Sequence, residues 1–107
     1  MGLDAQVIAI GPFSQDVVEA LEYPPGHYGN VQQGDVVVTN VFVAGTSEDS
    51  HALAKAFDIG AWELGSHHLR PEEADIPRLI ELSDERHVQQ FLTLRDNGFQ
   101  FYYLPNG

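Results

Sequence analysis

Cysteine is absent from this chain of 107 residues. Without thiols, the protein has no disulfide, no thiolate-held zinc or iron–sulfur centre and no cysteine nucleophile. No apolar run approaches the ~20 residues of a membrane-spanning helix, and no basic segment followed by an apolar one opens the chain. We therefore expect a cytoplasmic protein that does not bind membranes.

Basic residues are also scarce. Only 5 Lys and Arg residues stand against 16 Asp and Glu residues, which gives a formal net charge of -11. This charge repels phosphate backbones and anionic lipids, so direct nucleic-acid binding is not expected. A basic protein surface is the expected partner, because opposite charges speed encounter and favour a specific complex. The alternative is that the charge serves only solubility.

The length indicates a single globular domain over residues 1–107, which needs neither metal nor disulfide to fold. Residues 35–43, DVVVTNVFV, have apolar side chains on both alternating faces. In a regular strand, Val36, Val38 and Phe42 share one face, and Val37, Val41 and Val43 share the other. Apolar residues on both faces are typical of a strand that is covered on both sides. We expect this stretch to be the central strand of the sheet.

Further strands are predicted at 7–10, 61–64 and 99–104. Residues 23–34 are predicted to form a loop, because they contain two prolines and three glycines. Helices are predicted after Ser14, after Thr46 or Ser47, after Arg70 and from Asp84 to Asn97. Pro77 either restarts or bends the third helix. The order of elements predicts an α+β or open α/β fold. It is one two-layer domain, with a sheet of three or four strands packed against three or four helices.

Two groups of residues are candidates for partner binding. The loop group provides aromatic contact area at a low entropic cost and consists of Tyr23, His27 and Tyr28. The acidic group is concentrated in sequence and consists of Glu72, Glu73, Asp75, Asp84 and Glu85. The alternative for the loop is that its tyrosines fold back over an edge of the sheet.

Histidines and carboxylates suggest a second hypothesis, a site for a divalent metal or a small ligand. Its candidate residues are His51, Glu63, His67 and His68. Glu63 and His67 would share one face of a helix, but Gly65 and Ser66 oppose a helix there. No other cofactor is predicted. No catalytic residue is assigned either, because the sequence has no G-x-S-x-G motif and Ser14 serves as a helix cap.

The chain is similar in size and charge to small acidic immunity or inhibitor proteins that neutralise a basic partner. This similarity is compositional, covers no motif and transfers no residue. The sequence therefore favours a non-enzymatic, acidic interaction module that binds a basic protein. The alternative is a small ligand- or metal-binding protein, with or without enzymatic activity. A homodimer is compatible with both, since an exposed closing strand at 99–104 could pair with its copy.

Overall fold

The computed structural model describes residues 5–21, 26, 30–59 and 67–105. Five antiparallel strands form one sheet in the order β2-β3-β1-β5-β4. They are β1 (Ala5–Pro12), β2 (Val31–Gln33), β3 (Val36–Ala44), β4 (His67–Leu69) and β5 (Gln100–Pro105). The helices are α1 (Gln15–Ala20), α2 (Ser47–Ala56), α3 (Ile76–Leu82) and α4 (Glu85–Asp96), and a 3-10 turn, η1 (Pro71–Glu73), precedes α3.

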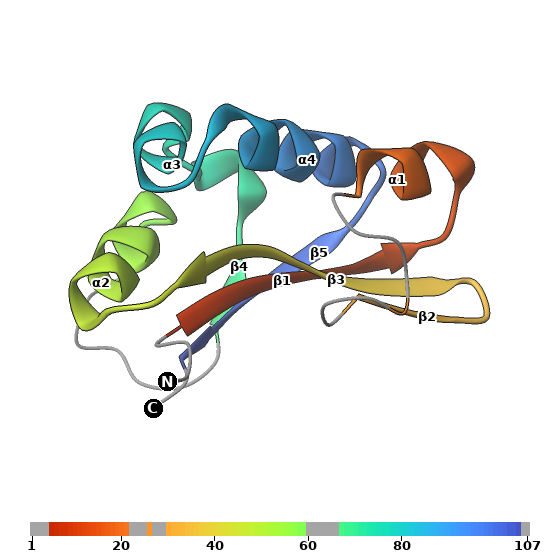
Figure 1. Cartoon of the computed structure of the whole chain (residues 1–107), viewed down its shortest axis with the longest axis horizontal. Helices are drawn as coiled ribbons and strands as arrows, with labels where there is room; N and C mark the ends of the chain where they lie inside the picture. The colour runs from red at the N-terminus through yellow and green to blue at the C-terminus, as the bar shows by residue number, and fades with distance from the viewer. Residues whose placement is uncertain (1–4, 22–25, 27–29, 60–66, 106–107) are drawn as a thin grey trace.

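The helices α1 to α4 all lie on one side of the sheet (Figure 1). The predicted two-layer α+β architecture is thus confirmed, although the sheet has five strands instead of three or four. The open α/β alternative is wrong, because β1 pairs with β3 and with β5 in antiparallel directions. Among the described residues, none of the helices is long and apolar enough to cross a membrane.

A β-bulge at Val41 changes which residues of β3 face the helices. Val7 lies opposite Phe42 and the next residue, Ile8, lies opposite Asn40, so Val41 is the extra residue. Val41 and Phe42 are consequently both buried, with 4% and 3% of their surface exposed. The bulge thus exchanges the predicted faces of Phe42 and Val43, since Val43 now points away from the helices.

The prediction that β3 is covered on both faces is wrong. Val37 is fully buried, whereas Val36 and Val43 are 47% and 57% exposed. The helices cover only one face, as is common for antiparallel sheets. β3 is an interior strand between β2 and β1, but β1 is the central strand. We call the other side the outer sheet face; by register and burial it comprises Gln6, Ile8, Ile10, Pro12, Val31, Gln33, Val36, Val38, Asn40, Val43, His68, Gln100, Tyr102 and Leu104.

The helix starts follow the predicted caps. Ser14 accepts a hydrogen bond from the Val17 amide at 3.2 Å, and Thr46 accepts one from the Asp49 amide at 3.1 Å. Asp84 caps α4 in the same way. α3 begins afresh after η1, with Pro77 in its first turn and Asp75 as its cap. Pro77 therefore starts a helix and does not bend one.

Of three predictions about the strands, two need correction and one concerns residues outside the described part of the chain. The predicted loop 23–34 ends in β2, which forms a hairpin with β3 around Gly34. The left-handed conformation of Gly34, with φ of 61°, permits this turn. β5 lies between β1 and β4, so the closing strand is not an edge that could pair with a copy. The strand predicted at 61–64 lies outside the described residues, and β4 follows it at His67–Leu69.

A cluster of phenylalanine rings connects the two layers. Phe91 of α4 lies with its ring centroid 4.8 Å from Phe101 of β5 and 5.7 Å from Phe42 of β3. Phe57, at the end of α2, packs against Phe91 at 5.7 Å in an edge-to-face arrangement. These rings pack α2 and α4 against the sheet.

Candidate interaction site

Thirteen of the 16 acidic residues lie in the described part of the chain, and all of them are exposed. They occupy the helices, their ends and the β2–β3 turn, a region that we call the acidic layer: Asp16, Glu19, Asp35, Glu48, Asp49, Asp58, Glu72, Glu73, Asp75, Glu81, Asp84, Glu85 and Asp96. Within this set, Asp75 forms an ion pair with Arg78 and Asp96 with Arg95, and Asp84 lies 3.0 Å from His87, a contact that is an ion pair only when the histidine is protonated. The other carboxylates are available to a partner.

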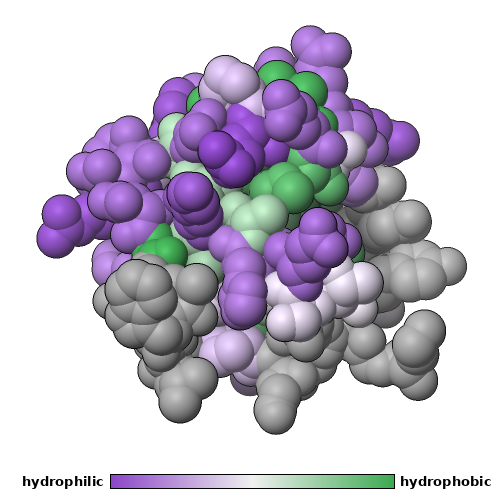
Figure 2. Space-filling model, turned by 90° about the vertical axis from the view of Figure 1, so that its left-hand side faces the viewer, coloured by the Kyte–Doolittle hydropathy of each residue, from purple (hydrophilic) through white to green (hydrophobic). Residues whose placement is uncertain are grey.

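The predicted acidic group lies on consecutive elements at one end of this layer. Glu72 and Glu73 belong to η1, Asp75 precedes α3, and Asp84 and Glu85 begin α4. Asp75 and Asp84 also cap their helices, accepting hydrogen bonds from the amides three residues later at 3.2 and 2.8 Å. On the side of the molecule drawn in Figure 2, hydrophilic side chains surround a small apolar area. The loop group, Tyr23, His27 and Tyr28, lies outside the described residues.

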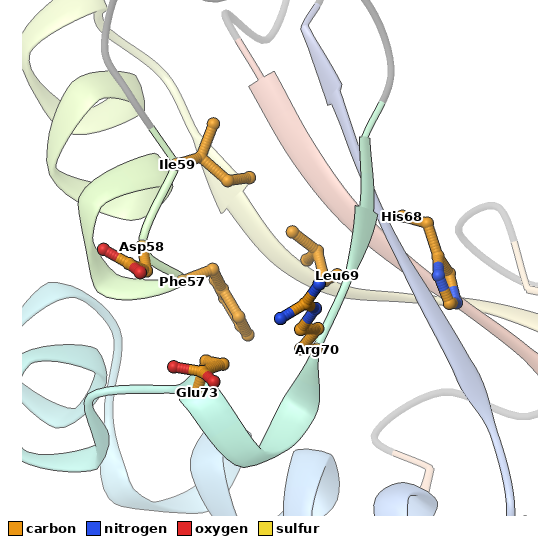
Figure 3. A pocket seen from close by; sticks show the side chains of 7 residues that line it. All are labelled: Phe57, Asp58, Ile59, His68, Leu69, Arg70 and Glu73. Carbon is orange, nitrogen blue, oxygen red and sulfur yellow. The ribbon is translucent and has the colours of Figure 1, made fainter.

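A pocket of about 180 Å³ opens between the end of α2, β4 and η1 (Figure 3). We call it the junction pocket; it is lined by Phe57, Asp58, Ile59, His68, Leu69, Arg70 and Glu73. The Asp75 amide donates a hydrogen bond to the Ala56 carbonyl at 2.8 Å and so ties the start of α3 to the end of α2. The pocket therefore lies between the end of α2 and the continuous segment that contains β4 and η1.

Asp58 ends α2 in an unusual backbone conformation. Its φ is 61°, in the left-handed region that favours glycine, and no other described non-glycine residue has a positive φ. The amide of Ile59 donates to the Ala54 carbonyl at 2.9 Å, and the amide of Asp58 donates to the Lys55 carbonyl at 3.0 Å. This is the Schellman arrangement that commonly ends helices. Asp58 thus occupies a position where glycine is usual, and it lies at the rim of the junction pocket.

The junction pocket combines an apolar floor with charges of both signs. Phe57 and Leu69 are buried, and the Arg70 side chain reaches from the end of β4 into the space between Phe57 and Glu73 (Figure 3). Arg70 makes no ion pair with any described residue. Small-molecule sites usually measure about 300–1,000 Å³, so the pocket suits one large side chain or a very small ligand.

The described residues provide no support for the metal hypothesis. His51 is exposed on α2, and His68 lies on β4, where its ring makes a hydrogen bond of 2.6 Å with the Gln100 side chain. The His68 ring also packs against Tyr102 and points away from the junction pocket (Figure 3). In the part of the chain that is described, no three potential ligands gather around one point. Glu63 lies outside that part, as does the side chain of His67.

Comparisons with known proteins identify no relative: no family model matches the chain, no curated protein is significantly similar, and no solved structure matches its fold. The site must therefore be interpreted from its own geometry.

Sequence reasoning missed the junction pocket together with Asp58 and Arg70. One local signal was present, because α2 ends at Phe57-Asp58 without the glycine or asparagine that usually follows a helix. The approach of β4 and η1 to this end of α2 has no local signal, since it depends on how the two layers pack.

Proposed function

We propose that this protein is a non-enzymatic interaction module that binds a basic protein surface through the end of its acidic layer that carries the predicted acidic group and the junction pocket. The observation that carries the proposal is where the described acidic residues lie. Twelve of the 13 lie on the helices and η1 or at their ends, Asp35 lies in the β2–β3 turn, and the outer sheet face has none. A one-sided field of this kind orients a basic partner before contact and speeds association.

The junction pocket is the proposed anchor point within this layer. A lysine or arginine side chain of the partner would pack its aliphatic stem on Phe57 and Leu69, with its charge beside Asp58 and Glu73. A pocket of about 180 Å³ accommodates one such side chain. Arg70, on the same rim, would bind a carboxylate of the partner and thereby fix the partner's orientation.

The test compares two variants that have equal net charge but in which the neutralised acidic residues lie in different places. The site variant neutralises the predicted acidic group with Glu72→Gln, Glu73→Gln, Asp75→Asn, Asp84→Asn and Glu85→Gln. Asparagine caps helices as well as aspartate does, so both helix starts are kept. The control neutralises five acids elsewhere with Asp16→Asn, Glu19→Gln, Asp35→Asn, Glu48→Gln and Asp49→Asn. Each variant changes the formal charge from -11 to -6, since five negative charges are removed.

The partner is captured from a lysate of the source cells on the immobilised protein and purified, and its Kd is measured at low and high NaCl concentration. We expect the site variant to raise the Kd more than about tenfold and the control less than about threefold. Salt should weaken binding of the wild type. Equal losses in both variants, binding that ignores salt, or no specific capture would each contradict the proposal.

The second candidate is a small-ligand-binding protein whose site is the junction pocket; the metal-binding version, with His51, Glu63, His67 and His68, has its basis in the sequence alone. The observation in its favour is that the junction pocket holds charges of both signs, which suits a very small zwitterion such as an amino acid. Zinc chloride and single amino acids are the probes, with the unfolding temperature as the readout. A zinc-dependent rise that His67→Ala/His68→Ala abolishes would support the metal version, and an amino-acid-dependent rise that Arg70→Ala abolishes would support the ligand version.

A further inference from the structure

We propose that the junction pocket binds the C-terminal residue of the basic partner and that this residue is a lysine or an arginine. The inference rests on the proposed function and adds to it the identity of the anchor residue. It differs from the amino-acid alternative, because the α-amino group of a C-terminal residue lies in a peptide bond and is uncharged. The ligand's positive charge is then on the side chain, and its negative charge is the terminal carboxylate.

The junction pocket holds opposite charges that do not pair with each other. Asp58, Arg70 and Glu73 all line it. No ion pair joins Arg70 to Asp58, to Glu73 or to any other carboxylate in the described ranges. A ligand with one charge of each sign provides a partner for the carboxylates and for the guanidinium group. A ligand with a single charge leaves one of them unpaired.

The position of Arg70 disfavours a basic side chain that arrives alone. The Arg70 side chain reaches into the space between Phe57 and Glu73 (Figure 3), so an incoming ammonium group comes close to a charge of its own sign. A terminal carboxylate offsets this repulsion, because it is covalently joined to the basic side chain and enters with it. A guanidinium group binds a carboxylate through two parallel hydrogen bonds. A basic residue inside a chain brings no such carboxylate.

The size of the junction pocket also suits one terminal residue. Its volume of about 180 Å³ is below the roughly 300–1,000 Å³ of ordinary small-molecule sites. Phe57 and Leu69 are buried and provide apolar surface for the aliphatic stem of the side chain. Glu73 belongs both to the pocket and to the predicted acidic group, so the partner surface around its C-terminus would meet that group.

A single residue should bind the pocket weakly. Asp58, Arg70 and Glu73 are all exposed, and ion pairs in exposed positions contribute little because water and salt screen them. We therefore expect a Kd on the order of 1 mM for one terminal residue alone. In the complete complex, the acidic group provides the remaining affinity.

The test is an NMR titration of the isotope-labelled full chain at about 150 mM NaCl, with the amides of Leu69 and Arg70 as reporters of the pocket. N-acetyl-lysine carries both charges, N-acetyl-lysine amide lacks the carboxylate, and N-acetyl-norleucine lacks the ammonium group. The formal charge of -11 by itself favours the amide, which has a net positive charge. Tighter binding of N-acetyl-lysine is therefore the opposite of what net charge alone predicts.

Arg70→Gln removes the guanidinium group, and Arg86→Gln is the matched control. Arg86 is exposed on α4 and does not line the pocket. Each substitution changes the formal charge from -11 to -12, since one positive charge is removed. Circular dichroism establishes that both variants fold. We expect the wild type and the control to bind N-acetyl-lysine at least about threefold more tightly than either other probe, and Arg70→Gln to bind N-acetyl-lysine and its amide equally.

The inference is overturned if N-acetyl-lysine binds the wild type no more tightly than either other probe, if Arg70→Gln keeps the preference for the acid over the amide, or if no probe shifts the pocket signals. These outcomes leave the proposed function in place, because capture of a basic partner and its loss in the five-residue site variant do not require a terminal carboxylate. A selective pocket in a protein that captures no basic partner would contradict the proposed function and support the specificity of the pocket.

Discussion

Gly11 on β1 lies directly against the ring of Phe99. An ideal Cβ atom at Gly11 would overlap atoms of that ring, and Phe99 is only 4% exposed. The ring precedes β5, and its position depends on the turn after α4. Because glycine has no side chain, β1 and the residue that enters β5 can approach each other this closely.

Gly11→Ala should lower the free energy of unfolding by about 1–3 kcal/mol, because the added methyl group overpacks the core. Urea denaturation measures the change. Gly45→Ala is the matched control, since no atom lies within 4 Å of the added Cβ. Adding Phe99→Leu to Gly11→Ala should recover part of the loss in a double-mutant cycle. Equal effects of the two alanine substitutions would contradict the overlap.

Residue-scale features account for most of what the sequence predicted correctly. Ser14, Asp84 and Asn97 are the predicted ends of helices, and each lies where the pattern placed it. A cap depends on an oxygen and an amide three residues apart, so the signal is contained in a few neighbouring residues. Asp58 is the exception, because its left-handed conformation goes against the usual residue preference.

At the scale of elements, Asn30 connects the segment before β2 to the strand β3. Its side-chain oxygen accepts hydrogen bonds from the Thr39 hydroxyl at 2.7 Å and from the Asn40 amide at 3.2 Å. Asn30 and Thr39 are 4% and 0% exposed. β2 pairs with only the first part of β3, and Asn30 provides hydrogen bonds to β3 beyond the end of that ladder.

Asn30→Ala should lower the free energy of unfolding by about 1–3 kcal/mol, because the buried Thr39 hydroxyl loses a hydrogen-bond partner. It should also speed hydrogen exchange at the Asn40 amide, measured by NMR. Gln32→Ala is the control on the same hairpin, since its amide makes only an exposed bond to the Gly34 carbonyl at 3.2 Å. If both substitutions have the same effect, the Asn30 contacts do not hold the hairpin in place.

The elements that sequence reasoning missed are short and depend on partners. β2 and β4 have three residues each and are strands only because β3 and β5 lie beside them. The bulge at Val41 leaves no signal in DVVVTNVFV, since valine and phenylalanine are compatible with either face of a strand. The direction of pairing between β1 and β3 is likewise a property of two segments together.

At the scale of the whole molecule, the excess of unpaired carboxylates opposes folding. Of the 13 acids in the described part of the chain, two make ion pairs with arginine, and Asp84 makes one with His87 only when that histidine is protonated. The remaining like charges repel one another across the acidic layer, and this repulsion is weakest when the chain is unfolded and expanded. Salt screens such repulsion between exposed charges.

Raising NaCl from about 10 mM to about 200 mM should therefore raise the free energy of unfolding, measured by urea denaturation at neutral pH. The variant Glu19→Gln/Glu81→Gln removes two exposed, unpaired charges and changes the formal charge from -11 to -9. It should be more stable than the wild type at low salt and respond less to added salt. Lower stability in salt would show that favourable ion pairs outweigh the repulsion.

The sequence by itself determined the acidic character of the protein, the main helices and the apolar strands, because composition, caps and periodicity are properties of short segments. Only the tertiary structure decided the antiparallel order of the sheet, the exposed side of β3 and the junction pocket beside Asp58. The physical reason is that burial is a relation between distant segments. A valine in a strand is apolar whether a helix covers it or not, so its sequence cannot say which side of the sheet meets water.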